Sequence, residues 1–233
     1  MGVTEISLFV LEIIGTIAFT ISGAFAAIKA RLDVFGVAFI GIITAVGGGI
    51  VRDIIIGHNP PRIFDNYPIL IIAFATAIIA FIVACVLGKK FDGISLMVDK
   101  VNNIFDAIGL GAFSVIGTEI AFVEGVSGNP LLAILLGLLT GVGGGVVRDV
   151  LTASTPYIFK KHVYAVASIV GAVAYYVIRL FVDYIWLPSL VGMVLVIIIR
   201  LLATKYRWSL PKAHLEMEPI FAHHHKHHDD KKE

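Results

Sequence analysis

The sequence predicts an all-α, polytopic membrane protein with seven transmembrane helices, arranged as two inverted three-helix repeats followed by an extra helix. Two observations support this fold class. Of the 233 residues, 58% are hydrophobic and only 15% are charged, which is typical of a chain that lies in a bilayer. The motif GGGIVRD at residues 47–53 also returns as GGGVVRD at residues 143–149, 96 residues later.

Seven apolar stretches have roughly the 20 residues that a helix needs to cross about 30 Å of hydrocarbon. They are residues 5–28, 34–57, 68–87, 103–123, 130–153, 162–182 and 187–204. A β-barrel would need shorter segments of alternating polarity, whereas residues 69–87 are apolar almost without interruption. We therefore expect spanning helices joined by short loops.

The basic residues at the ends of these stretches predict the orientation of the chain. Eleven lie on one side, namely Lys29, Arg31, Lys89, Lys90, Lys100, Lys160, Lys161, Arg200, Lys205, Arg207 and Lys212. Only Arg62 and Arg179 lie on the other side. The positive-inside rule then places the N-terminus outside and the C-terminus in the cytoplasm of a cell membrane protein.

The repeat extends well beyond the glycine motif. Residues 41–53 match residues 137–149 at nine of thirteen positions, and residues 15–23 resemble residues 109–117. The two units therefore cover about 5–87 and 103–182, with three spans each. Because three is odd, the second unit must enter the membrane from the opposite face. Residues 1–206 form one transmembrane domain, in which the helix at 187–204 has no counterpart.

The two glycine triplets are costly for a transmembrane helix. Each would destabilise a helix by about 3 kcal/mol relative to alanine, where no water replaces lost hydrogen bonds. Close helix packing is one explanation, because small residues four apart let two backbones approach. We favour a second interpretation, in which each triplet breaks its helix and exposes backbone groups to a hydrated path. The candidate residues are Gly47, Gly48, Gly49, Gly143, Gly144 and Gly145.

An arginine and an aspartate follow each triplet by about one helical turn, as Arg52 with Asp53 and as Arg148 with Asp149. Charges inside a span are rare and usually functional. Neighbouring residues project about 100° apart on a helix, so the two members of each pair need not bind each other. Each charge either belongs to a structural ion pair, for example one between the repeats, or lines a hydrated path.

Further acids lie within the predicted spans. Glu12 and Asp106 correspond at an offset of 94 residues, and Glu119 lies further along the fourth span. Each acid could cap a helix, pair with a repeat arginine or attract cations. We count Glu12 and Asp106 among the residues that line the path.

Together these features, over about residues 5–204, resemble the prokaryotic branch of the trimeric intracellular cation (TRIC) channel superfamily. The resemblance implies a homotrimer that conducts monovalent cations such as K⁺ and Na⁺, with one pore per protomer. It also implies that the triplets bend the second and fifth helices around that pore. Animal members bind phosphoinositide with a lysine and an arginine after a triplet, a pattern from which Asp149 departs. The same broad family includes proteins that look like bacterial glycine carriers, so transport of a small zwitterion stays open as the alternative.

Other functions find no support in the sequence. Residues 207–233 form a polar tail with five histidines within residues 223–228, but their spacing lacks the geometry of a folded zinc site. We expect a disordered cytoplasmic tail and no metal site. We predict no enzyme and no cofactor, because no Ser-His-Asp set, HExxH motif or phosphate loop occurs. A net charge of +1 argues against nucleic acid as a partner. The expected partners are monovalent cations and membrane lipid.

Overall fold

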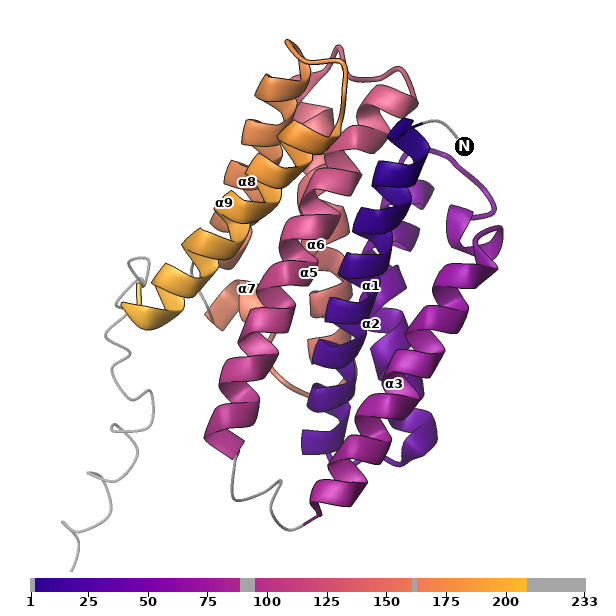
Figure 1. Ribbon diagram of the computed structural model, residues 1–233, viewed down its shortest axis with the longest axis vertical. Coiled ribbons are helices and arrows are strands. Elements are labelled where there is room, and N and C mark those ends of the chain that lie inside the picture. Colours follow the sequence, from indigo (N-terminus) through magenta and orange to yellow (C-terminus); the bar gives the residue numbers. More distant parts are fainter. Residues whose placement is uncertain (1–2, 89–94, 161–162, 209–233) are drawn as a thin grey trace, which may run out of the picture.

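The computed structural model describes residues 3–88, 95–160 and 163–208, and within these residues every regular element is helical. Figure 1 shows the long helices packed side by side in one bundle. In chain order the elements are α1 (Val3–Lys29), α2 (Val34–Ile55), η1 (Arg62–Phe64), α3 (Tyr67–Leu87), α5 (Ser95–Val123), α6 (Pro130–Leu151), α7 (Tyr157–Lys160), α8 (Tyr164–Arg179) and α9 (Trp186–Lys205). The all-α membrane fold predicted from the sequence is confirmed.

Six of these helices are long and apolar enough to cross a membrane, and the sixth predicted span is the exception. There α8 has 16 residues and a length of about 24 Å, which is short for about 30 Å of hydrocarbon. The fourth span differs in the other direction, because α5 begins at Ser95 rather than near residue 103. Its added turns carry polar residues, among them Asp99 and Asn102.

The second helix of each repeat begins at an equivalent cap. The Asp33 carboxylate accepts a hydrogen bond from the Gly36 amide at 2.8 Å, and the Asn129 side chain accepts one from the Leu132 amide at 3.1 Å. Each side chain thereby satisfies an amide of the first helical turn, which has no partner within the helix. The start of α2 and of α6 is thus encoded locally, in corresponding positions of the two repeats.

The two repeats run in opposite directions. In Figure 1, α1 begins at the top of the view, whereas α5, its counterpart, begins at the bottom. Equivalent contacts recur in each repeat: a Cβ at Gly23 would overlap the side chain of Thr44, and a Cβ at Gly117 would overlap the side chain of Thr140. The offsets of 94 and 96 residues are those of the sequence repeat, so both units pack their first two helices in the same way.

Small residues set the spacing of the remaining helices. The buried face of α3 contains Ile69 and then Ala73, Ala77, Ala80 and Ala84, three or four residues apart. A Cβ at Gly41 of α2 would lie 3.2 Å from the Cβ of Ala77, so α3 packs closely on α2. On the other side, α9 packs against α5 and α8 through the backbones of Gly111, Gly171 and Gly192.

Two parts of the sequence analysis fall outside the described residues. One is the predicted tail at 207–233, of which only Arg207 and Trp208 are described. The other is the part of the charge count that rests on Lys89, Lys90, Lys161 and Lys212. The orientation of the chain in the membrane stays a prediction.

Candidate functional site

The glycine triplets lie where α2 and α6 cross at the centre of the bundle. A Cβ added to Gly48 would overlap the carbonyl oxygen of Thr140, and a Cβ added to Gly144 would overlap the carbonyl oxygen of Thr44. The contact is therefore reciprocal, as expected for helices related by a pseudo-two-fold axis. In each helix the threonine and the glycine are four residues apart, the spacing of a small-xxx-small contact.

The expected break at the triplets is not present, because α2 and α6 are continuous helices from Val34 to Ile55 and from Pro130 to Leu151. The sequence interpretation that glycine frees backbone groups is therefore wrong for this structure. Packing accounts for Gly48, Gly143 and Gly144, since a Cβ at Gly143 would lie only 3.0 Å from the Gly48 Cα. A Cβ at Gly47 would make an ordinary contact, 3.7 Å from the Gly144 Cα. Direct contact between the backbones offsets the low helix propensity of glycine.

The third glycine of each triplet faces the arginine one turn later instead of the other helix. A Cβ at Gly49 would meet only the Arg52 Nη2 atom, at 3.6 Å. A Cβ at Gly145 would lie 3.7 Å from the Arg148 Nη2 atom and 3.0 Å from the Tyr164 hydroxyl. The triplets therefore have two distinct roles: they let α2 and α6 cross in close contact, and they leave space for a buried guanidinium group.

In the first repeat the arginine and the aspartate bind each other. The sequence analysis left this contact open, because neighbouring residues on a helix need not meet. The Arg52 Nε and Nη2 atoms both donate to the Asp53 Oδ1 atom, at 2.9 and 2.8 Å. The Asp53 Oδ2 atom accepts from the backbone amide of Arg62 in η1, at 2.9 Å. Asp53 is 1% exposed and has both oxygens bonded, so this carboxylate ties η1 to the end of α2.

The second repeat has the same arrangement with additional charges. The Arg148 Nε atom donates to the Asp149 Oδ1 atom at 2.8 Å, and the Asp149 Oδ2 atom accepts from the Tyr157 amide in α7 at 2.8 Å. The Arg148 Nη1 atom also donates to Ser22 and to Asp106, at 2.6 and 2.8 Å. Arg148 therefore joins α1, α5 and α6 while remaining 1% exposed.

Arg200 completes this second cluster, although the sequence analysis counted it among the cytoplasmic anchors. It is 1% exposed, its Nη2 atom lies 3.5 Å from the Asp106 Oδ2 atom, and its guanidinium lies over the Tyr164 ring. The count of basic residues at span ends misplaced Arg200, because it considers how far a residue lies from the end of a span and not the direction of its side chain. Periodicity within the last span could have signalled it, since Gly192, Val196, Arg200 and Ala203 form one buried face of α9.

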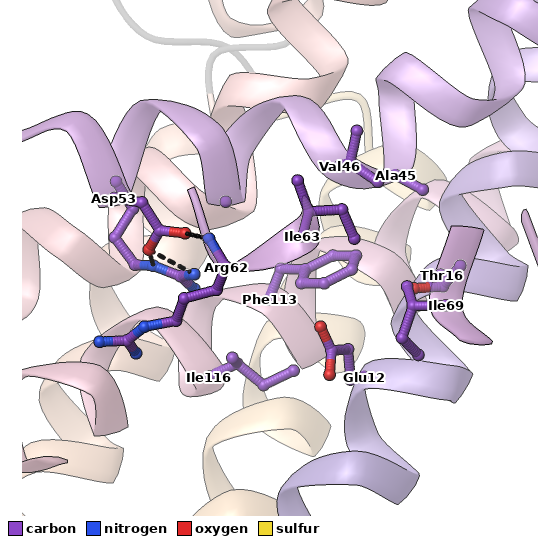
Figure 2. A pocket seen from close by; sticks show the side chains of 12 residues that line it. Glu12, Thr16, Ala45, Val46, Asp53, Arg62, Ile63, Ile69, Phe113 and Ile116 are labelled. Atoms are coloured by element: carbon purple, nitrogen blue, oxygen red, sulfur yellow. Dashed lines mark hydrogen bonds and ion pairs between the residues drawn. The ribbon is translucent and has the colours of Figure 1, made fainter. Parts of the chain in front are cut away.

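A small cavity adjoins the first Arg–Asp pair. Its volume is about 40 Å³, enough for roughly three water molecules. In Figure 2, Asp53 and Arg62 lie together on one side of this cavity and Glu12 lies on the other side. Ile63 and Phe113 lie between these two groups. Glu12 accepts a hydrogen bond from the Asn66 side chain at 3.1 Å, while Arg52 pairs with Asp53. An exposed ion pair between Arg62 and Glu124 lies at this end of the bundle.

A larger cavity, of about 280 Å³, adjoins the second Arg–Asp pair. It lies at the opposite end of the bundle, between the end of α1, the start of α5 and the end of α6. The residues that line it are mostly of polar or charged type, namely Lys29, Asp99, Asn102, Arg148, Asp149, Thr152, Ser154, Thr155 and Tyr157, with Ala26 and Ala30. An exposed ion pair between Lys29 and Asp99 joins α1 to α5 beside it. None of these lining residues also lines the first cavity.

Apolar side chains fill the bundle between the two cavities. Phe19 and Phe113 pack with their ring centroids 5.3 Å apart, within a buried cluster that also contains Ala45 and Val46. Ala45, Val46 and Phe113 also line the first cavity. Packed apolar side chains beside the crossing of α2 and α6 therefore lie between the two cavities.

The structure brings the predicted polar residues together in two groups rather than one. Arg52, Asp53 and Glu12 border the first cavity, while Arg148 and Asp149 border the second. Asp106 is 0% exposed and contacts Arg148, and it lines neither of these two cavities. Glu119, the third predicted acid, binds Tyr175 and Arg179 elsewhere in the bundle.

Comparison with known proteins shows which family the chain resembles. A family model described as "Glycine transporter" matches residues 9–84 and 103–179. The inner membrane protein YadS of Escherichia coli is 38% identical over 205 residues, covering 86% of this chain and 93% of that protein. The membrane protein YvgT of Bacillus subtilis is 32% identical over 213 residues, covering 89% and 97%.

Solved structures of TRIC channels share the fold. One TRIC cation channel is 34% identical with a TM-score of 0.76, covering 90% of this chain and 98% of that chain. A prokaryotic TRIC channel crystallised in 0.5 M KCl is 32% identical with a TM-score of 0.78, covering 88% and 100%. The trimeric intracellular cation channel orthologue of Rhodobacter sphaeroides is 26% identical with a TM-score of 0.76, covering 86% and 98%.

Proposed function

The chain belongs to the glycine transporter family and to the TRIC channel superfamily, and on that premise we propose that it is a channel for monovalent cations such as K⁺ and Na⁺. Each protomer of a homotrimer contains its own hydrated path. The N-terminus of the chain lies outside the cell and the C-terminus in the cytoplasm.

One observation carries this proposal: two cavities lie towards opposite ends of the bundle, each beside a buried Arg–Asp pair. A cation could lose part of its hydration shell to the oxygens of Glu12 in the first cavity and of Asp99 in the second. Each buried arginine is bonded to a carboxylate, so it adds little net repulsion to the path.

The constriction at Phe19 and Phe113 supplies the gate of the proposed channel. Its apolar lining disfavours a continuous file of water, and conduction then requires the two aromatic rings to move apart. The closely packed crossing of α2 and α6 acts as the fixed point of that movement. The glycine triplets therefore bring the two helices together beside the path without breaking them.

A carrier for a small zwitterion such as glycine is the second candidate. The description of the matching family and the greater volume of the second cavity favour it. A carrier opens one cavity at a time, whereas a channel opens both together.

Single-channel recording with the purified chain in planar bilayers separates the two candidates. The proposed channel gives discrete K⁺ current steps, and Asp149→Asn or Arg148→Ala changes their size or the K⁺/Cl⁻ permeability ratio while the trimer persists. Electrical silence together with saturable glycine uptake into liposomes would favour the carrier and refute the channel. Crosslinking in mild detergent tests the trimer separately, and a purely monomeric product would contradict it.

A further inference from the structure

Each repeat places a strongly exposed phenylalanine on the short helix that follows its second spanning helix. Phe64 in η1 is 65% exposed, and Phe159 in α7 is 71% exposed. The two residues lie 95 positions apart and end the matching segments PRIF, at residues 61–64, and PYIF, at residues 156–159. A single exposed aromatic ring is ordinary, but its recurrence at equivalent positions indicates a shared environment.

The residue before each phenylalanine packs into the bundle. Ile63 and Ile158 both contact the buried cluster that contains Phe19 and Phe113. Each short helix therefore has one apolar side chain inside the bundle and one outside it.

Both short helices are tied to the buried Arg–Asp pairs through their backbones. The Arg62 amide donates to the Asp53 Oδ2 atom, and the Tyr157 amide donates to the Asp149 Oδ2 atom. In each case the exposed phenylalanine follows the tied amide by two residues. Whatever holds the ring thus also holds the aspartate beside a cavity.

The two rings lie at opposite ends and on opposite sides of the bundle. Residues of η1 line the first cavity, whereas Tyr157 of α7 lines the second. Moreover, η1 packs beside α3 and α7 packs beside α8, and Figure 1 shows α3 and α8 on opposite sides of the bundle. In a closed trimer the two contact faces of a protomer adjoin at the three-fold axis. Neighbouring copies of the chain therefore cannot cover both rings.

The surface next to Phe64 indicates membrane lipid instead. Along α3 follow Tyr67, Ile71 and Phe74, three or four residues apart and each more than half exposed. This is the outward stripe of a helix long and apolar enough to span a membrane. Phe64 precedes the first residue of that stripe by three positions, so it lies where the lipid-facing surface reaches the end of the bundle.

The aromatic residues of α9 mark the same level at the other end. Tyr206 and Trp208 are stacked after the last turn of α9, about 30 Å from its start, which is the thickness of the hydrocarbon core. Such rings prefer the membrane interface. Arg200, near this end of α9, lies over the ring of Tyr164, the first residue of α8. Because α7 directly precedes α8, Phe159 lies at this end of the bundle too.

From these contacts we infer that η1 and α7 lie in the two membrane interfaces. Phe64 and Phe159 insert into opposite leaflets, at the boundary between lipid headgroups and acyl chains. The bilayer thereby holds the two short helices, and their backbones hold Asp53 and Asp149. The inference goes beyond cation conduction, because it assigns the surface through which lipid acts on both cavities and requires no ion flow.

Depth measurement by spin labelling tests this inference on the full-length chain in phosphatidylcholine vesicles. Cys85→Ala removes the single cysteine, and Phe64→Cys or Phe159→Cys then carries a nitroxide. Both labels should collide with oxygen as well as with a polar nickel complex, at an intermediate depth. Collisions mainly with nickel would place the rings in water, and few collisions with either reagent would place them under protein, such as a second copy. Either result overturns the inference.

Three further labels calibrate the depth. Ile79→Cys, on the exposed face in the middle of α3, should meet oxygen almost alone. Asp65→Cys and Thr155→Cys are exposed polar neighbours of the two short helices and should meet mainly the nickel complex. If the labels at 64 and 159 matched these two polar positions, the proposed insertion would be excluded.

Two matched variants test the link to the buried pairs. Asn has one acceptor oxygen where Asp has two, so Asp53→Asn cannot bind both Arg52 and the Arg62 amide. The label at 64 should then change its depth or mobility, while the label at 159 stays the same. Asp149→Asn should have the reverse effect, so each variant controls for the other. No change at either label in either variant contradicts the link.

K⁺ currents from the unlabelled chain separate this inference from the proposed function. Currents from a chain whose labels lie in water overturn the interfacial position and leave the channel standing. Interfacial labels on an electrically silent chain support the inference and refute the channel.

Discussion

The substitution Gly48→Ala tests the reciprocal crossing of α2 and α6 most directly. The added Cβ would overlap the carbonyl oxygen of Thr140, and a backbone atom cannot rotate away as a side chain can. The two helices must therefore separate by more than about 1 Å to restore a normal carbon contact. Overpacking of this kind costs about 1–3 kcal/mol. For a chain of this size the loss corresponds to a melting temperature between about 2 and 12 °C lower.

Gly49→Ala is the matched control one residue further along the chain. Its Cβ would meet only the Arg52 Nη2 atom, at 3.6 Å, which is an ordinary contact. Alanine also favours the helix by up to about 1 kcal/mol over glycine. The melting temperature should then stay the same or rise by up to about 4 °C.

Thermal unfolding of both variants in detergent, followed by the fraction that remains monodisperse in size-exclusion chromatography, measures the difference. Gly144→Ala should lose as much stability as Gly48→Ala, because its Cβ would overlap the Thr44 carbonyl in the same way. If Gly48→Ala and Gly49→Ala melted within about 2 °C of each other, the packing role of the crossing would be refuted.

Three further outcomes follow from the buried charges and the constriction. Arg200→Met leaves Asp106 with one cationic partner in a buried site and costs about 3–5 kcal/mol, more than Lys29→Met, which breaks an exposed ion pair; equal thermal shifts would contradict the second cluster. Glu12→Gln lowers unitary K⁺ conductance at about 0.1 M KCl more than at about 1 M KCl, where the Debye length falls from about 10 to about 3 Å; the same change at both salt concentrations would argue against an electrostatic role. Phe113→Ala widens the constriction and raises the open probability in bilayer recordings, and an unchanged open probability would exclude this ring from the gate.

The sequence predicts the helices and their inversion well, because both depend on local properties. Hydrocarbon thickness sets the length of each apolar stretch, and the nine matches between residues 41–53 and 137–149 reveal the repeat. The boundaries differ mainly where polar residues extend a helix beyond the bilayer core, as in the first turns of α5.

The sequence is a poorer guide to what the triplet glycines and the buried charged residues contact. The low helix propensity of three glycines predicts a broken helix, but a backbone contact from a segment 96 residues away reverses that outcome at Gly48. Arg200 resembles a surface anchor until α9 is packed against α5, when it contacts Asp106.

The crossing of α2 and α6 is self-complementary, since Thr44 and Gly48 present to α6 the same surface that Thr140 and Gly144 present to α2. A three-helix chain half as long, inserted into the bilayer in both orientations, would already possess the patch needed to pair with its own antiparallel copy. Gene duplication and fusion would then make that pairing permanent. After duplication the sequences of the two halves could diverge. Only the second half is followed by α9, which carries the buried Arg200.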